Sequence, residues 1–106
     1  MSQRFKRNMP ILRALYNAKP SERKKFLSSV SDDTINALCD CACNIVQGNV
    51  PLTTKQYKQL KPYHKQLKGL QRKSSSQKHK RKVLQSGGFL GMLLKPIAKL
   101  LLGAFN

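Results

Sequence analysis

Residues 31–46, SDDTINALCDCACNIV, carry the clearest helical signal in this chain of 106 residues. Ser31 can cap a helix, and Asp32 and Asp33 lie in its first turn, where the helix dipole favours negative charge. Gly48-Asn49 then supplies a C-terminal stop. Apolar side chains recur between these signals with a period of 3.6 residues: Ile35, Leu38, Cys39, Ala42, Ile45 and Val46. We therefore predict an amphipathic helix with one buried face.

Shorter helical patterns flank this one. Apolar residues recur at helical spacing just after Pro10 and again after Pro20, where proline suits the start of a helix. A further helix should open with a capping box at Thr53, and Pro62 should kink it or split it into two abutting segments. The sequence thus predicts an all-α fold, with a small helical domain of about four short helices over residues 1–71.

The charge of the chain is strongly asymmetric. All 4 carboxylates lie within the first forty residues, whereas residues 41–106 hold thirteen of the 21 Lys and Arg, and the net charge is +17. Charge of one sign attracts polyanions, so nucleic acid or an anionic membrane surface is the expected partner. The candidate nucleic-acid-binding residues are the cations of the middle region: Lys55, Lys58, Lys61, Lys65, Lys68, Arg72, Lys73, Lys78, Lys80, Arg81 and Lys82.

No element that reads base sequence accompanies this charge. There is no zinc finger, recognition-helix signature or heptad-linked basic region. Lysine outnumbers arginine, which favours neutralisation of phosphates over bidentate recognition of bases. We therefore expect binding and condensation of double-stranded DNA without sequence preference. The alternatives are a nuclear-localisation signal, a merely solvated charged face, and a chromatin or ribosomal protein that prefers structured RNA.

The C-terminal third divides into a basic and an apolar segment. Residues 72–82 contain no apolar side chain to offset the entropy of ordering, so we predict a disordered, basic and Gly-rich linker over residues 72–88. Residues 89–106 predict an apolar to amphipathic helix that is too short, and too interrupted by Lys95 and Lys99, to cross a bilayer. Its candidate contact residues are Phe89, Leu90, Leu93, Leu94, Ile97, Leu100, Leu101 and Phe105.

Several surfaces could receive this apolar helix. It could lie on an anionic membrane, dock on a capsid protein, or pack on a second copy or on the protein's own helices. A membrane-active or capsid-docking protein is therefore the alternative to a DNA-binding one.

Neither catalysis nor metal binding has support in the sequence. The spacing of Cys39, Cys41 and Cys43 is not a standard zinc arrangement, and small buried thiols in a reducing compartment explain it better. The scarce carboxylates and the two histidines suggest no acid–base pair or nucleophile triad. We expect no enzyme activity, no metal and no other cofactor.

Three stretches, in this order, resemble one known family: residues 44–53 (NIVQGNVPLT), 60–70 and 80–90 (KRKVLQSGGFL). The chain resembles the small basic protein of Maverick or Polinton elements and the related adintoviruses, which is itself similar to adenovirus core protein X, the precursor of mu. The resemblance implies a virion protein that associates with packaged double-stranded DNA and is found in the virion and the host nucleus.

The resemblance also implies processing. In adenoviruses a cysteine protease cuts such precursors after a Leu, Ile or Met, any residue, then Gly-Gly or Gly-x-Gly. Leu84-Gln85-Ser86-Gly87-Gly88 is close to this pattern, although Ser86 stands where the first glycine belongs. A viral cysteine protease is therefore an expected partner, with Leu84, Gly87 and Gly88 as its site, and a plain hinge is the alternative.

Overall fold

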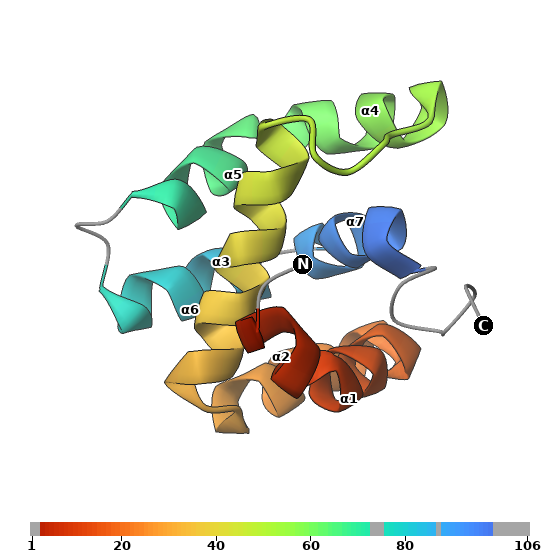
Figure 1. The fold of residues 1–106 in the computed structure, drawn as a ribbon. Helices are drawn as coiled ribbons and strands as arrows, with labels where there is room; N and C mark the ends of the chain where they lie inside the picture. The colour runs from red at the N-terminus through yellow and green to blue at the C-terminus, as the bar shows by residue number, and fades with distance from the viewer. Residues whose placement is uncertain (1–2, 73–75, 87, 99–106) are drawn as a thin grey trace.

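The computed structural model describes residues 3–72, 76–86 and 88–98, and throughout these ranges the regular elements are helical (Figure 1). The all-α prediction is therefore confirmed. The elements are α1 (Gln3–Asn17), α2 (Pro20–Ser29), α3 (Asp32–Val46), α4 (Thr54–Leu60), the 3-10 turn η1 (Lys61–Tyr63), α5 (His64–Gln71), α6 (Gln77–Gln85), α7 (Phe89–Leu94) and the 3-10 turn η2 (Lys95–Ile97).

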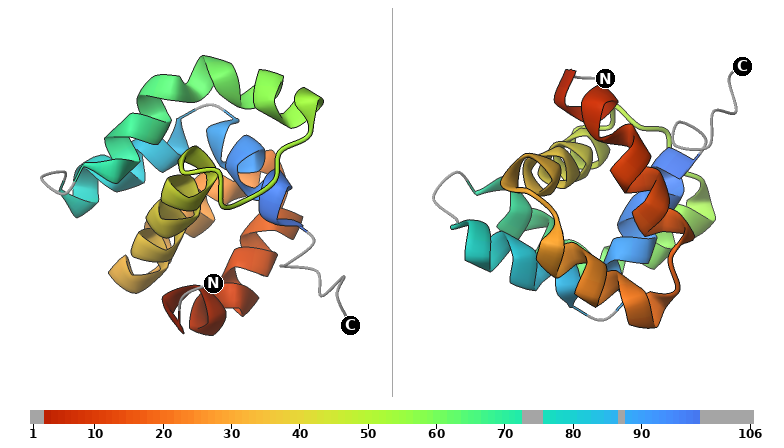
Figure 2. Two further views of the ribbon diagram at one scale, coloured as in Figure 1. Left: turned by 45° about the horizontal axis from the view of Figure 1, so that its top comes forward. Right: turned by 90° about the horizontal axis from the view of Figure 1, so that it is seen from below.

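Helix α3 occupies the middle of the fold, with α1 packed along one side of it and α5 and α6 along the other (Figures 1 and 2). The predicted cap is present, since the Ser31 hydroxyl accepts a hydrogen bond from the Thr34 amide at 3.2 Å. The predicted stripe is buried except for Val46, which is 50% exposed at the end of the helix. Cys41 is also fully buried, because neighbours on two sides cover more of α3 than a single apolar stripe requires.

Helix α1 begins earlier than its apolar pattern predicts. It starts at Gln3 and continues through Pro10, whereas the sequence pattern placed the helix after that proline. Phe5 and Asn8 explain the extension, because both are buried on the first half of the helix. The Asn8 side chain also donates a hydrogen bond to the Arg4 carbonyl at 2.8 Å, which helps to hold the turn before the proline.

The predicted capping box and the effect of Pro62 are both confirmed. The Thr53 hydroxyl accepts from the Gln56 amide at 3.1 Å, and the Gln56 side chain accepts from the Thr53 amide at 3.0 Å. Pro62 then lies in η1, the short turn that separates α4 from α5. The ring of a proline cannot continue the α-helical hydrogen bonds, so the two α-helical segments abut instead of forming one rod.

The prediction of a disordered linker is wrong for Gln77–Gln85, which form helix α6. Leu84 on this helix is 1% exposed. Arg81 donates to the carbonyls of Leu27 and Val30, at 3.0 and 2.7 Å, and so binds α6 to the C-terminal end of α2. Long polar side chains can bury their aliphatic stems while their charged ends make hydrogen bonds. A count of apolar residues does not include this buried area, so it underestimates how well such a segment can fold.

The C-terminal apolar segment packs against the protein's own helices, one of the alternatives that the sequence left open. Phe89, Leu93, Leu94 and Ile97 are 0% exposed and Leu90 is 4% exposed. The Phe89 ring contacts that of Tyr63, with centroids 5.5 Å apart. Within the described residues the predicted single helix is interrupted, because α7 ends at Leu94 and the 3-10 turn η2 follows from Lys95 to Ile97.

The predicted contact residues Leu100, Leu101 and Phe105 lie outside the described residues. Within the described ranges, no helix combines the length and the apolar character that crossing a bilayer requires.

Candidate nucleic-acid interface

Arginine side chains bind three of the 4 acidic residues, and all three of those acids lie on α3. Because these carboxylates are engaged within the fold, they do little to offset the cations on other surfaces. The shortest pair at each acid is Arg7–Asp33 at 2.7 Å, Arg4–Asp40 at 3.1 Å and Arg81–Asp32 at 3.0 Å, and Arg4 also lies 3.6 Å from Asp33.

Asp33 is the best bound of these carboxylates. Both of its oxygens accept from the Arg7 guanidinium, at 2.7 and 2.9 Å, and one also accepts from the Asn8 amide at 2.8 Å. These hydrogen bonds, with that from Arg7 the strongest influence, hold the pKa of Asp33 well below its usual range. The buried Asn8 in turn accepts a hydrogen bond from the Thr34 hydroxyl at 2.7 Å, so the acidic cluster fixes α1 against the start of α3.

The lysines are placed differently. Six cations of the candidate set recur every three or four residues along α4, η1 and α5, and all are exposed. We call them the lysine stripe: Lys55, Lys58, Lys61, Lys65, Lys68 and Arg72. Residues three and four apart on a helix lie on one side of it, so these charges follow one edge of the molecule. None of the ion pairs found among the described residues involves the stripe.

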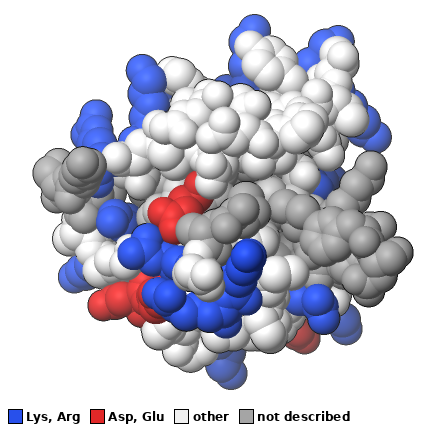
Figure 3. Space-filling model, viewed as in Figure 1, with Lys and Arg blue, Asp and Glu red and all other residues white. Residues whose placement is uncertain are grey.

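The surface charge follows this division. On the face drawn in Figure 3, the charged side chains along the upper edge, where α4 and α5 run, are all Lys or Arg. Acidic side chains on the same face lie nearer the centre and the bottom. The molecule therefore presents an edge without acid, toward which a polyanion would be drawn.

Helix α6 brings His79 next to the stripe. Helices α5 and α6 pack side by side, and an open groove of about 840 Å³ runs between them. Lys65, Lys68 and Arg72 line this groove on the α5 side. His64 and His79 also line it, and the sequence reasoning had not included them in the interface. Two imidazoles beside three cations offer further hydrogen-bond donors to a phosphate.

The other five candidate cations have separate positions. Lys78 and Lys82 are exposed on α6. Lys80 is half-buried in a hollow that it shares with Asp40 and Cys39. Arg81 is engaged within the fold, because its side chain is only 22% exposed and its guanidinium bonds α2 and Asp32. Lys73 lies outside the described residues.

The cysteines have the predicted character of small buried thiols. Cys39 and Cys41 are buried and Cys43 is half-buried. Burial raises the pKa of Cys39 to about 11 and that of Cys41 to about 12, so both thiols stay protonated at neutral pH. Within the described part of the chain, no three His, Cys, Asp or Glu side chains come together as a metal site.

The predicted protease site has a folded conformation in part. Leu84 is buried within α6, and Gly88 is exposed with φ of 64°, a left-handed conformation that suits glycine. Gly87 lies outside the described residues. Proteases bind their substrates as extended strands, so cleavage here would require the last turn of α6 to unwind.

Searches with the whole chain found no matching protein family, no similar curated protein and no similar solved structure. The distribution of charge over the fold is therefore the main guide to function.

Proposed function

We propose that this protein binds and condenses double-stranded DNA without sequence preference, as a core protein in the virion of a DNA virus or a virus-like mobile element. The observation that supports the proposal best is the lysine stripe. Its cations are exposed, and none of them pairs with a carboxylate among the described residues. The setting in a virion and a host nucleus rests on the resemblance to the Maverick and adintovirus basic proteins.

The dimensions of the stripe suit several phosphates at once. From Lys55 to Arg72 the chain is 18 residues long, and the break at η1 keeps its span below the ~27 Å that 18 residues of one straight helix would reach. The upper limit corresponds to about eight base pairs, since each strand carries a phosphate about every 3.4 Å along the axis. The stripe offers mobile ammonium groups instead of rigid guanidinium forks, which neutralise phosphates without reading base edges.

Condensation requires that one molecule contact more than one duplex. Exposed lysines on α1 and α2 and in the turn between them supply a second cationic surface: Lys6, Lys19, Lys24 and Lys25. In Figure 1 these two helices lie at the bottom of the molecule, whereas α4 and α5 run along the top. Cations on opposite sides allow the protein to bridge neighbouring DNA segments.

The test is a salt titration of binding to two duplexes of unrelated sequence. Because each phosphate contact releases condensed counterions, about six contacts give a slope near −5 in a plot of log affinity against log salt concentration. We expect the same slope and affinity for both duplexes. A flat salt dependence, or a strong preference for one duplex, would refute the proposal. Mass spectrometry of purified particles would test the virion setting separately.

The alternative, a membrane-active or capsid-docking C-terminal helix, gains no support from the described residues. The five apolar side chains from Phe89 to Ile97 would have to leave the core to contact a membrane or a capsid. Exposing each costs about 1.5–3 kcal/mol, so their sum is comparable with the whole stability of a domain, about 5–15 kcal/mol.

A further inference from the structure

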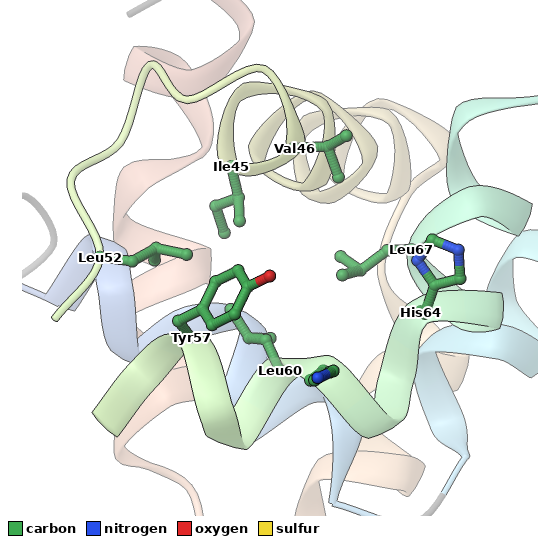
Figure 4. Close-up of a pocket in the computed structure, with 8 residues that line it drawn as sticks. Ile45, Val46, Leu52, Tyr57, Leu60, His64 and Leu67 are labelled. Carbon is green, nitrogen blue, oxygen red and sulfur yellow. The ribbon is translucent and has the colours of Figure 1, made fainter. Parts of the chain in front are cut away.

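An apolar groove separates the C-terminal end of α3 from α4 and α5 (Figure 4). Ile45 and Val46 line it on the α3 side, and Tyr57, Leu60 and Leu67 line it on the other (Figure 4). Its volume is about 530 Å³, within the range of about 300–1,000 Å³ that is usual for binding sites. The groove can therefore receive several large apolar side chains.

The rim of the groove carries unusually exposed apolar side chains. The described residues include three large hydrophobic side chains that are exposed: Ile11 at 37%, Val46 at 50% and Tyr57 at 60%. Two of the three, Val46 and Tyr57, line the groove. Exposed apolar side chains that gather around a hollow mark an interaction surface, whereas a single one such as Ile11 needs no explanation.

The charge around the groove selects the kind of partner. Its polar lining residues are Lys61 and His64 beside the Tyr57 hydroxyl, and no carboxylate lines it. Lys58 and Lys65 are exposed on the same two helices, α4 and α5. A partner must therefore combine apolar side chains for the groove with negative charge for its rim.

We infer that this groove binds an amphipathic helix of an acidic partner protein. The apolar side chains of that helix, spaced i, i+3 or i+4 and i+7, enter between Val46 and Tyr57, in the manner of other helix-in-groove complexes. Its carboxylates flank the apolar face and lie against Lys61. The rim shares Lys58, Lys61 and Lys65 with the lysine stripe, so the acidic partner and DNA compete for these cations, whereas the apolar contacts at Val46 and Tyr57 belong to the groove alone.

The probe is a fluorescein-labelled peptide of about 16 residues, long enough to hold a helix in water. Its leucines lie on one face and glutamates cover the other, and a control peptide has the same composition with the leucines scattered. Binding is measured by anisotropy at about 0.15 M salt, where charges more than about 8 Å apart are screened. We expect the amphipathic peptide to bind at least tenfold more tightly than the scattered control.

A matched pair of variants locates the site. Val46→Asp introduces a carboxylate at the rim, and Ile11→Asp makes the same change at an exposed apolar residue of α1 that is not among the groove's lining residues. We expect Val46→Asp to weaken the peptide at least tenfold and Ile11→Asp less than twofold. Tyr57→Ser provides a second test if Val46→Asp fails to fold, which circular dichroism would reveal.

Four results would overturn the inference. Equal binding of the two peptides would show attraction by charge alone, and equal losses in Val46→Asp and Ile11→Asp would show that the groove is not the site. Self-association of the protein that Val46→Asp abolishes would assign the groove to a second copy. Binding to anionic vesicles that Val46→Asp abolishes, without binding of the peptide, would assign it to lipid.

Discussion

Replacing three lysines of the stripe with glutamine should reduce DNA affinity far more than replacing three lysines elsewhere. The test variant is Lys58→Gln with Lys65→Gln and Lys68→Gln, all exposed on α4 and α5. The control is the same triple change at three exposed lysines beside or on α2: Lys19, Lys24 and Lys25. Both variants lower the net charge equally from +17, and glutamine resembles lysine in helix propensity, so both should fold.

The magnitude follows from counterion release. Each phosphate contact contributes about 0.9 to the slope of log affinity against log salt concentration. Loss of three contacts should therefore flatten the slope by about 2.7 and weaken binding by about 500-fold at 0.1 M salt. With the duplex in trace amounts, so that each protein holds one duplex, the control should lose less than about tenfold, because the second surface has fewer cations than the stripe and is needed for bridging, not for holding a single duplex.

Fluorescence anisotropy on two unrelated labelled duplexes, with salt varied from about 0.05 to 0.3 M, measures both quantities within the range where such contacts dominate affinity. Equal losses in the two variants would show that net charge alone drives binding and that the stripe has no special role. An unchanged slope in the stripe variant would show that these lysines do not contact phosphate.

Three further predictions concern the fold. Arg81→Gln should lower the free energy of unfolding by about 2–3 kcal/mol, since it leaves the carbonyls of Leu27 and Val30, at the end of α2, without their charged donor. Urea denaturation measures this, and Lys82→Gln on the exposed side of α6 should cost less than about 0.5 kcal/mol. In the native protein, Cys43 should react with iodoacetamide well before Cys41, which is buried and whose pKa is raised to about 12 by that burial. Mass spectrometry of partly labelled protein measures the order, and equal labelling of the two thiols would contradict the burial of Cys41 on α3. The pKa of Asp33 is lower in the folded protein than the ordinary aspartate value of about 3.9, so its ion pair stabilises the fold above that pH, and this stability is lost as the pH falls toward the folded value. Between pH 5 and pH 2 the melting temperature should therefore fall less steeply for Asp33→Asn than for the original protein.

The features that the sequence predicted well are local. The caps at Ser31 and Thr53 involve residues only three positions apart, and the break at Pro62 follows from its own ring. The positions of the stripe follow from helical spacing in the same way. Signals of this kind can be recognised without knowing what packs against the helix.

The features that the sequence missed depend on distant contacts. Helix α6 looked too polar to fold, but Arg81 bonds carbonyls more than fifty residues earlier in the chain. Val46 continued the apolar stripe of α3, yet it stays exposed because α4 and α5 leave a groove at that end. The juxtaposition of α5 and α6, which places His79 beside Lys65 and Lys68, also required the tertiary structure.

Most of the cations that hold the fold together are arginines, whereas the exposed stripe consists of lysines and Arg72. Arg4, Arg7, Arg23 and Arg81 bind carboxylates or helix-end carbonyls, whereas the lysines of the stripe point into solvent. Reagents or enzymes that acylate amines leave guanidinium groups untouched. Acetylation of these amines would therefore remove much of the outward charge while the arginine contacts between the helices remain, so the affinity of the surface for any polyanion could be lowered reversibly without unfolding the protein.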